Sequence, residues 1–326
     1  MLAGAPAWAQ GLVGQSGEEC SSAARAAAEA EKPGGGTLTL VSDGAGVATF
    51  TGSIVVPPDG VLTIEAGGAL DEDTGDFATV PDVDDVVLQP AMTSMPAITV
   101  SPNATVVIRG FTIQNAEPGI MVMDGATVDI TQMQILESVS AGISTGPNTD
   151  VAIAHSSISG NFGPGVLVQG GRTDIAQCTF RDNDAQAVFF DMGEGSLSAC
   201  ILSGNGGDAV STNADTDGLT IQQNLILDDN PVGADIDAIR VDPILRPGLT
   251  AEILFTEDSP IVGAVDPLSG VNVASGFARS DLPGRVSELS PFVDIFGVPR
   301  QASPLLAGAD EGNGSIATVG LVGVEI

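Results

Sequence analysis

The sequence of this chain contains an internal repeat of about 22 residues, which restricts the folds that it can adopt. A small residue followed by an apolar one recurs in steps of 22 or 23 residues, at Ala97-Ile98, Gly119-Ile120, Gly142-Ile143, Gly165-Val166, Ala187-Val188 and Ala209-Val210. A second apolar position keeps the same spacing, at Ile113, Ile135, Ile158, Phe180, Leu202 and Ile226. A polar turn residue follows each of these, at Asn115, Ser138, Asn161, Asn183, Asn205 and, after a small slip, Asn230. Three positions that share one period indicate a solenoid of stacked repeats.

Within each repeat the local pattern is that of short β-strands. Apolar and polar residues alternate, many of them are β-branched, and Gly, Asn and Asp bound the runs. Such a repeat buries its apolar side only by stacking, with each coil paired to the next at about 4.8 Å. The pattern predicts an all-β fold, a right-handed parallel β-helix, in which the polar turn residues form a ladder of side-chain hydrogen bonds. Leucine-rich repeats have a similar period, but their fixed leucine and asparagine signature is absent.

The repeat predicts a single β-helix domain over residues 20–326. Residues 20–33 have the composition of a helix that caps the open end of the first coil. Coils follow over residues 34–240, and residues 241–326 are expected to form an irregular C-terminal cap. Residues 69–95 break the period, so we expect a long loop there. This loop is acidic, with Asp71, Asp73, Asp76, Asp82, Asp84 and Asp85.

The chain is strongly acidic, with 42 acidic against 10 basic residues and a formal net charge of −32. A field of this sign disfavours nucleic acid and anionic membrane surfaces as partners. Its natural counter-charges are divalent cations, high salt or a basic partner. A saline habitat would favour the same acidity without any ligand, so both interpretations remain open.

The first ten residues, MLAGAPAWAQ, contain a small-x-small signal-peptidase pattern at Ala7-Trp8-Ala9. We therefore expect residues 1–19 to be the remnant of a signal peptide with a flexible start, and the protein to be secreted or held at a bacterial cell surface or in the periplasm. The alternative is an ordinary frayed terminus. No later stretch reaches the roughly 18 uninterrupted apolar residues of a membrane span, so none is expected.

Two segments resemble known β-helix proteins. The opening SAARAAAEAEKPGGGTLTL is similar to the start of many bacterial pectate-lyase-like β-helix proteins. The C-terminal series resembles the closing region of the "choice-of-anchor Q" group of surface proteins, and it consists of Val241-Asp242-Pro243-Ile244, Ser259-Pro260-Ile261, Asp294-Ile295-Phe296-Gly297-Val298-Pro299-Arg300 and Gly308-Ala309-Asp310-Glu311. The resemblance covers most of residues 21–311. It implies a secreted or surface-attached solenoid, in a group with no agreed biochemical activity.

The resemblance implies that a polysaccharide-acting site would lie on outward side chains of neighbouring coils. Residues one period apart stand side by side there, and those that flank the inward apolar positions point outward. Asp150 then stacks beside Arg172, with Asp129 and Asp174 nearby. Carboxylates with an arginine suit binding of Ca²⁺ and a uronic acid, or general acid–base catalysis. The same four residues equally fit a surface salt-bridge ladder that contributes little.

Motifs of known β-helix enzymes are incomplete here. Asn148-Thr149-Asp150 resembles the first motif of the polygalacturonase-like hydrolases, but the paired Asp, Gly-His-Gly and Arg-Ile-Lys motifs that follow it in that family are absent. His155, the only histidine, falls at a coil corner, where we expect a solvated turn residue. Epimerase-type β-helices use Tyr and His, and this chain has no Tyr. With nine arginines and one lysine, a lyase would need Ca²⁺ to neutralise its substrate's carboxylate.

One segment fits the first half of a calcium-binding loop, with Asn213, Asp215 and Asp217 as metal ligands. Asn224 replaces the bidentate Glu expected at the end of that loop. A solvated acidic turn is the alternative. The acidic residues of 71–85 are a second candidate on composition alone.

Apolar and sulfur-containing residues complete the set of candidates. The one Trp lies in the expected signal segment, which disfavours a strong aromatic platform for sugars. Met121, Leu167 and Phe189 share an outward register and form a candidate adhesive stripe. Cys178 and Cys200 share an inward register and should stack on adjacent coils; we expect buried thiols, with a disulfide as the alternative.

Two functions follow from these patterns. The first is a monomeric, non-catalytic extracellular or surface β-helix with an adhesion, matrix or glycan-associated role, with Ca²⁺ as a candidate ligand. It is favoured by the missing motifs and the scarce basic and aromatic residues. The second is a Ca²⁺-dependent polysaccharide lyase or hydrolase, whose site would be the Asp129, Asp150, Arg172 and Asp174 patch.

Overall fold

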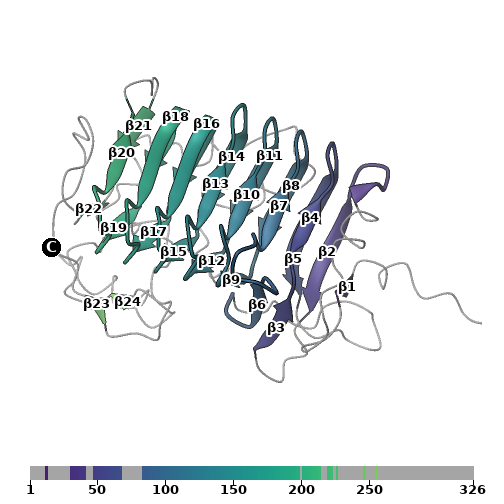
Figure 1. Cartoon of the computed structure of the whole chain (residues 1–326). Helices are drawn as coiled ribbons and strands as arrows, with labels where there is room; N and C mark the ends of the chain where they lie inside the picture. The colour runs from purple at the N-terminus through teal and green to yellow at the C-terminus, as the bar shows by residue number, and fades with distance from the viewer. Residues whose placement is uncertain are drawn as a thin grey trace, which may run out of the picture.

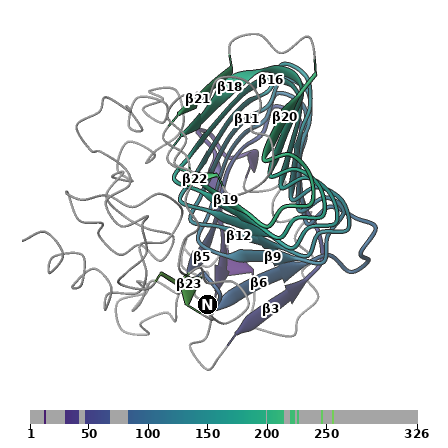
Figure 2. The same ribbon diagram turned by 90° about the vertical axis from the view of Figure 1, so that its left-hand side faces the viewer.

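A computed structural model of the chain describes residues 12–13, 30–41, 47–67, 83–198, 200–213, 219–222, 225–226, 245–246 and 254–255. Apart from one helical residue, Ala30, the regular structure in this part is entirely β. Short strands follow one another around each coil, and the coils stack along one axis (Figure 1). Figure 2, turned by 90°, shows the coils superimposed. The predicted all-β parallel β-helix is therefore confirmed.

Each coil contributes strands to three sheets. The first sheet contains β4 (Ile54–Val56), β7 (Ile98–Val100), β10 (Ile120–Val122), β13 (Ile143–Thr145), the beginnings of β16 (Val166–Ala176) and β18 (Val188–Ser198), and β20 (Val210–Thr212). The second contains β1 (Leu12–Val13), β2 (Gly36–Val41), β5 (Val61–Gly67), β8 (Thr105–Arg109), β11 (Thr127–Thr131), β14 (Asp150–Ala154), the ends of β16 and β18, and β21 (Leu219–Gln222). The third contains β3 (Ala48–Thr51), β6 (Val86–Gln89), β9 (Thr112–Gln114), β12 (Gln134–Leu136), β15 (Ser157–Ser159), β17 (Thr179–Arg181), β19 (Ile201–Ser203) and β22 (Leu225–Ile226). A separate antiparallel pair joins β23 (Leu245–Arg246) to β24 (Leu254–Phe255).

The strand register reproduces the repeat that was read from the sequence. The first apolar position aligns from coil to coil as Ile98, Ile120, Ile143, Val166, Val188 and Val210. The second aligns as Ile113, Ile135, Ile158, Phe180, Leu202 and Ile226. The pairing is parallel throughout these stacks, so residues of one kind form continuous columns along the solenoid.

The core consists of the inward columns of the three sheets. The aligned apolar side chains from Ile98 to Val210 are fully buried, and so are Phe50, Phe111, Phe180 and Phe190. Burying one such side chain stabilises the fold by about 1.5–3 kcal/mol. Steric crowding explains why a small residue precedes each first-sheet strand. At Gly142, for example, a Cβ atom would lie 2.7 Å from the carbonyl oxygen of Gly165 on the next coil. The close approach of successive coils therefore leaves no room for a side chain at Gly142, and other coils hold Gly or the small residue Ala at this position, as at Ala97 and Ala187.

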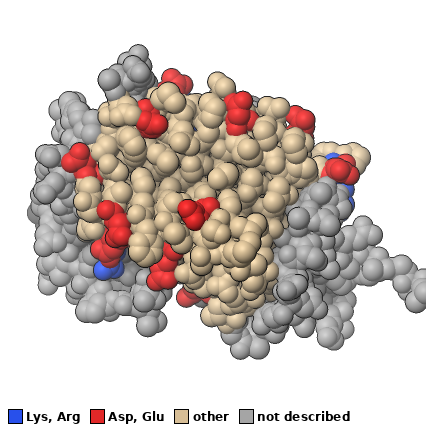
Figure 3. Space-filling model, in the orientation of Figure 1, with Lys and Arg blue, Asp and Glu red and all other residues tan. Residues whose placement is uncertain are grey.

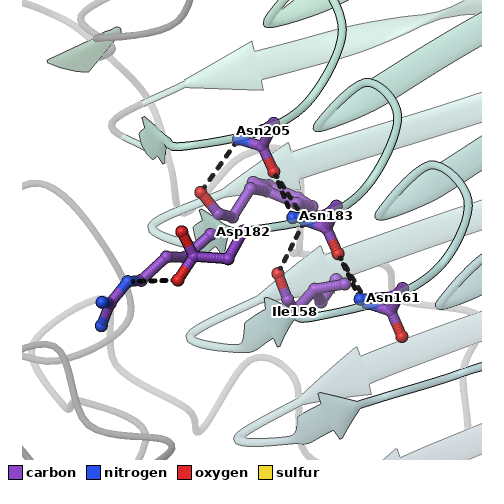
Figure 4. Close-up of polar contacts among 7 residues, drawn as sticks. Ile158, Asn161, Asp182, Asn183 and Asn205 are labelled. Atoms are coloured by element: carbon purple, nitrogen blue, oxygen red, sulfur yellow. Dashed lines mark hydrogen bonds and ion pairs between the residues drawn. The ribbon is translucent and has the colours of Figure 1, made fainter.

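The predicted polar ladder is present at the turn between the third and first sheets (Figure 4). Asn161 Nδ2 donates to Asn183 Oδ1 at 2.7 Å, and Asn183 Nδ2 donates to Asn205 Oδ1 at 2.7 Å. The side-chain oxygen of each Asn also accepts a backbone N–H of the preceding coil: Ser138 N–H donates to Asn161 Oδ1 at 2.9 Å, and the N–H groups of Asn161 and Asn183 donate to the next Asn along the ladder at 3.2 Å. Asn183 Nδ2 also donates to the carbonyl of Ile158 at 3.2 Å. The ladder thus satisfies the buried polar groups of a turn that lies inside the stack.

Asn115 was predicted as part of this ladder, and that prediction is wrong. Its φ of 57° places it one residue earlier, in a left-handed column with Glu137, Gly160, Asp182 and Gly204. The ladder position of that coil is taken by Ala116, which is buried. The turn of this coil is one residue shorter, so a polar residue near the expected spacing occupies a different position. Asn230 lies outside the described residues.

Several predicted segments fall wholly or mainly outside the described residues: the start at 1–19, most of the capping helix at 20–33, and the cap at 241–326 apart from β23 and β24. The predicted acidic loop over residues 69–95 is wrong for its last part. Val86–Gln89 forms β6, which pairs with β3 and β9, because its apolar residues Val86 and Leu88 are buried in the core. No helix in the described part of the chain is long and apolar enough to cross a membrane.

Candidate functional site

The four candidate catalytic residues lie on the outward side of the second sheet, in two adjacent columns. One column aligns Thr127, Asp150, Arg172 and Glu194 on successive coils. The other aligns Val107, Asp129, Ala152, Asp174 and Ser196. The predicted stacking of Asp150 beside Arg172 is therefore present, whereas Ala152 separates Asp129 from Asp174.

The column with Asp129 and Asp174 is not open to solvent. Asp129 is 0% exposed, Ala152 is 0% exposed and Asp174 is 3% exposed, although all three face away from the core of the solenoid. Asp129 and Asp174 thus point outward as predicted, but neither is accessible to a substrate. Asp129 and Asp174 lie two strand spacings apart, about 10 Å. The structure does not bring them together as an acid and base acting on one bond.

Arg172 forms ion pairs with the neighbouring carboxylates of Asp174 and Glu194. Its Nε and Nη2 bond to the two oxygens of Asp174 at 2.7 and 3.1 Å, and its Nη1 lies 3.7 Å from Glu194 Oε1. The hydrogen bond to Asp174, followed by the charges of Asp174, Glu194 and Asp150, raises the pKa of Arg172 against the opposing effect of burial. Ser196 Oγ donates to Asp174 at 2.8 Å. This bidentate pair is the geometry of a structural ion pair, the alternative that the sequence left open.

His155 occupies the predicted coil corner, with a φ of 48°, but it is buried, with 3% of its surface exposed. The expectation of a solvated turn residue is wrong. Outward side chains of the third sheet beyond this corner are buried as well, among them Gln134, Ser157 and Thr179. The outer side of the solenoid around this corner is therefore covered, which the alternation of polar and apolar residues does not reveal.

The segment that resembles the hydrolase motif forms a corner between the first and second sheets. Asn148 has a φ of 53° and donates from Nδ2 to Asp124 Oδ1 at 2.9 Å. Thr149 Oγ1 donates to the carbonyl of Gly146 at 2.9 Å. These contacts shape the turn, and they account for an Asn-Thr pair at this place without any catalytic role.

For the predicted calcium loop, only Asn213 lies among the described residues, and its amide donates to Asp191 Oδ1 of the preceding coil. Asp215, Asp217 and the acidic residues 71–82 lie outside them. Within the part of the chain that the structure describes, no group of three His, Cys, Asp or Glu side chains is placed to hold a metal ion.

Cys178 and Cys200 stack on adjacent coils inside the core, as predicted, and both are free thiols. The backbone N–H of Cys178 donates to Cys200 Sγ at 3.4 Å. Burial, reinforced by the neighbouring Cys178, raises the pKa of Cys200 well above its ordinary value. Low reactivity follows, because the thiolate is the reactive form.

The most regular exposed surface is the outer side of the first sheet. Its central outward column consists of Val55, Thr99, Met121, Ser144, Leu167, Phe189 and Ser211. Met123 and Met192 extend it toward the second sheet. We call these nine residues the apolar strip. The predicted stripe of Met121, Leu167 and Phe189 thus has the expected register, but the sequence did not reveal that it belongs to a continuous uncharged surface (Figure 3).

Carboxylates border the apolar strip on both long sides, which we call its acidic edges. Asp59, Asp124 and Asp191 lie at the corner toward the second sheet, each accepting a hydrogen bond from an Asn of the following coil. Glu117, Asp184 and Asp208 lie at the turn that carries the Asn ladder. The ion pairs of the described arginines are made with Glu65, Asp174, Glu194 and Asp182, and none involves these six carboxylates.

A family model described as a right-handed β-helix region matches residues 93–226, which span the coils from β7 to β22. No curated protein matches the chain in sequence. The family match and the parallel stacking together support the right-handed β-helix fold of the coils.

Proposed function

We propose that this protein is an extracellular or cell-surface β-helix that binds a partner in an adhesion or matrix role and is not an enzyme. The observation that carries the proposal is a contrast between two outer surfaces. The column with the candidate catalytic carboxylates Asp129 and Asp174 is buried, whereas the residues of the apolar strip are half-buried or exposed, and the strip runs across successive coils. An acid–base site needs groups within reach of a substrate, while a binding surface needs accessible and complementary area.

The expected location rests on the ends of the sequence. Ala7-Trp8-Ala9 has the form of a signal-peptidase site. The C-terminal series from Val241 to Glu311 resembles that of the choice-of-anchor Q surface proteins. Both features support export, and the second supports retention at the cell surface. The two fates are separated by fractionating cells that make the full-length protein into medium, envelope and cytoplasm.

The test of the proposed function is a paired assay of binding and degradation. The full chain is incubated with a panel of acidic and neutral polysaccharides and with intact cell envelopes, with Ca²⁺ or with a chelator. Retention is measured by co-sedimentation, and cleavage by new reducing ends and unsaturated products. Retention without products in either condition is the expected result. Products that disappear with the chelator would contradict the proposal.

A second candidate function, a Ca²⁺-dependent polysaccharide lyase or hydrolase, is favoured by one observation. Asp150, Arg172 and Glu194 stand in register on three consecutive coils, and the Arg172 and Glu194 side chains are 52% and 55% exposed. In such a site Arg172 would bind the carboxylate of an acidic sugar, and Asp150 or Glu194 would contribute one ligand to a Ca²⁺ ion. If cleavage is found, Arg172→Ala should abolish it; activity that survives this substitution would place the site elsewhere.

A further inference from the structure

The apolar strip has the composition of an adaptable binding surface. Of the seven methionines in the chain, Met133 is buried in the core, whereas Met121, Met123 and Met192 lie on the strip. Met92 and Met95, which are 59% and 37% exposed, lie in the loop that precedes β7. Methionine is flexible and polarisable, and it is favoured at surfaces that adapt to an apolar partner. An outward face of this kind is comparable to the largest apolar patch of a typical monomeric protein, and such patches are often functional.

The dimensions of the strip restrict what covers it. Seven adjacent strands, from β4 to β20, span about 29 Å along the solenoid, and three residues per strand span about 10 Å across it. The resulting area of about 300 Å² is well below the ~800 Å² per partner of a stable protein–protein interface, so a second copy of the chain is a poor occupant. An α-helix of about 20 residues is 30 Å long and 10–12 Å wide, and it matches both dimensions.

The acidic edges define the charge of that helix. Carboxylates border both long sides of the strip, at Asp59, Asp124 and Asp191 on one side and at Glu117, Asp184 and Asp208 on the other. A neutral glycan would leave these carboxylates unused, and an acidic partner would be repelled. A helix with an apolar face against the strip and basic residues flanking that face would satisfy the whole surface.

We infer that the apolar strip and its acidic edges form a docking surface for a basic amphipathic helix of a partner protein, laid across the first-sheet strands. Helix-on-sheet packing is the ordinary way in which an apolar sheet face is covered. This inference deepens the proposed binding function and rests on it. The small area predicts a weak and reversible complex, with a dissociation constant in the micromolar range.

The probe is a labelled peptide of about 20 residues made of Leu and Lys, with Leu at helical spacing on one face. Its binding to the full chain is followed by fluorescence anisotropy, and its helicity by circular dichroism. A second peptide of the same composition, scrambled so that it has no apolar face, controls for attraction to the negative charge of the protein. Saturable binding of the amphipathic peptide with a gain in helicity is expected. Equal binding of both peptides would overturn the inference.

Two substitutions locate the site. Leu167→Asp and Phe189→Asp each place a carboxylate on the strip, and each should weaken binding by about tenfold or more, since the charge would be buried against the apolar face of the helix. Leu136→Asp is the matched control, because Leu136 is also partly buried and faces outward, on the third sheet. Loss of binding in all three variants, or in none, would overturn the assignment.

A further variant addresses the acidic edges without touching the strip. Asp124→Asn with Asp184→Asn should weaken binding of the amphipathic peptide and reduce its dependence on salt. Unchanged affinity would overturn the requirement for a basic partner. If instead Leu167→Asp abolishes retention on a neutral polysaccharide while no peptide binds, the helix inference fails and the proposed binding function stands. If neither peptide nor any member of the panel is bound, both fail.

Discussion

Replacing Asn183 by alanine tests how far the Asn ladder holds the coils together. The Asn183 side chain takes part in four hydrogen bonds: it accepts from Asn161 Nδ2 at 2.7 Å and Asn161 N at 3.2 Å, and it donates to Asn205 Oδ1 at 2.7 Å and to the carbonyl of Ile158 at 3.2 Å. With a net contribution of about 1 kcal/mol for each bond, the free energy of unfolding should fall by about 4 kcal/mol. Relaxation of the turn would reduce this value, and the buried donors left without a partner would increase it.

The assay is denaturant-induced unfolding of the full chain, followed by far-ultraviolet circular dichroism, with the midpoint and the slope compared between variants. Gln114→Ala is the control, because Gln114 is half-buried and makes one long hydrogen bond to Gln89 at 3.4 Å. Its cost should stay below about 0.5 kcal/mol. A shift for Asn183→Ala no larger than that of Gln114→Ala would refute the view that the ladder stabilises the stack.

Three further predictions concern the core and the second sheet. Gly142→Val should destabilise the fold by about 1–3 kcal/mol in the same assay, because its side chain would meet the carbonyl of Gly165; an unchanged midpoint would contradict the close approach. Arg172→Ala should cost about 1 kcal/mol, because the buried Asp174 carboxylate loses its cation but Arg172 itself is half-exposed and screened by solvent; a cost near zero would show that the ion pair does not stabilise the fold. Because the pKa of Cys200 is raised in the folded state, its contribution to stability is complete below the ordinary thiol pKa of about 8.5 and is lost as the pH rises through the folded value. Cys200→Ser should therefore flatten the decline in melting temperature at alkaline pH, and an identical decline would refute this.

The repeat could be predicted because the inward positions are under a strong and periodic constraint. Each coil must place an apolar residue such as Ile120 or Ile143 against the same position of its neighbour, and a small residue where carbonyls of the next coil approach. These demands recur at every coil and so are visible in one sequence. The exception, Asn115, shows the limit, since a turn shorter by one residue moves a polar side chain out of the ladder without changing its appearance in the sequence.

The candidate site could be predicted only in part. Alternation along β11 and β16 correctly assigns Asp129 and Asp174 to the outer side of the sheet. It does not reveal whether that side meets solvent, because a strand's period of two reports direction and not what lies beyond the side chain. The burial of His155 could not be predicted for the same reason. For the outer face of the first sheet, the sequence pattern indicated only Met121, Leu167 and Phe189. The strand register shows that they belong to one continuous column.

The parallel register of the first sheet has a consequence for how such a protein changes over generations. Every coil adds one rung to the apolar strip, so duplication or loss of one 22-residue unit lengthens or shortens the strip by about 4.8 Å and leaves the remaining rungs in place. A single outward substitution, such as one at Ser144, changes one rung without disturbing the packing of Ile143 beneath it. The length of the strip and the side chains that it displays can therefore change while the fold of the solenoid stays the same.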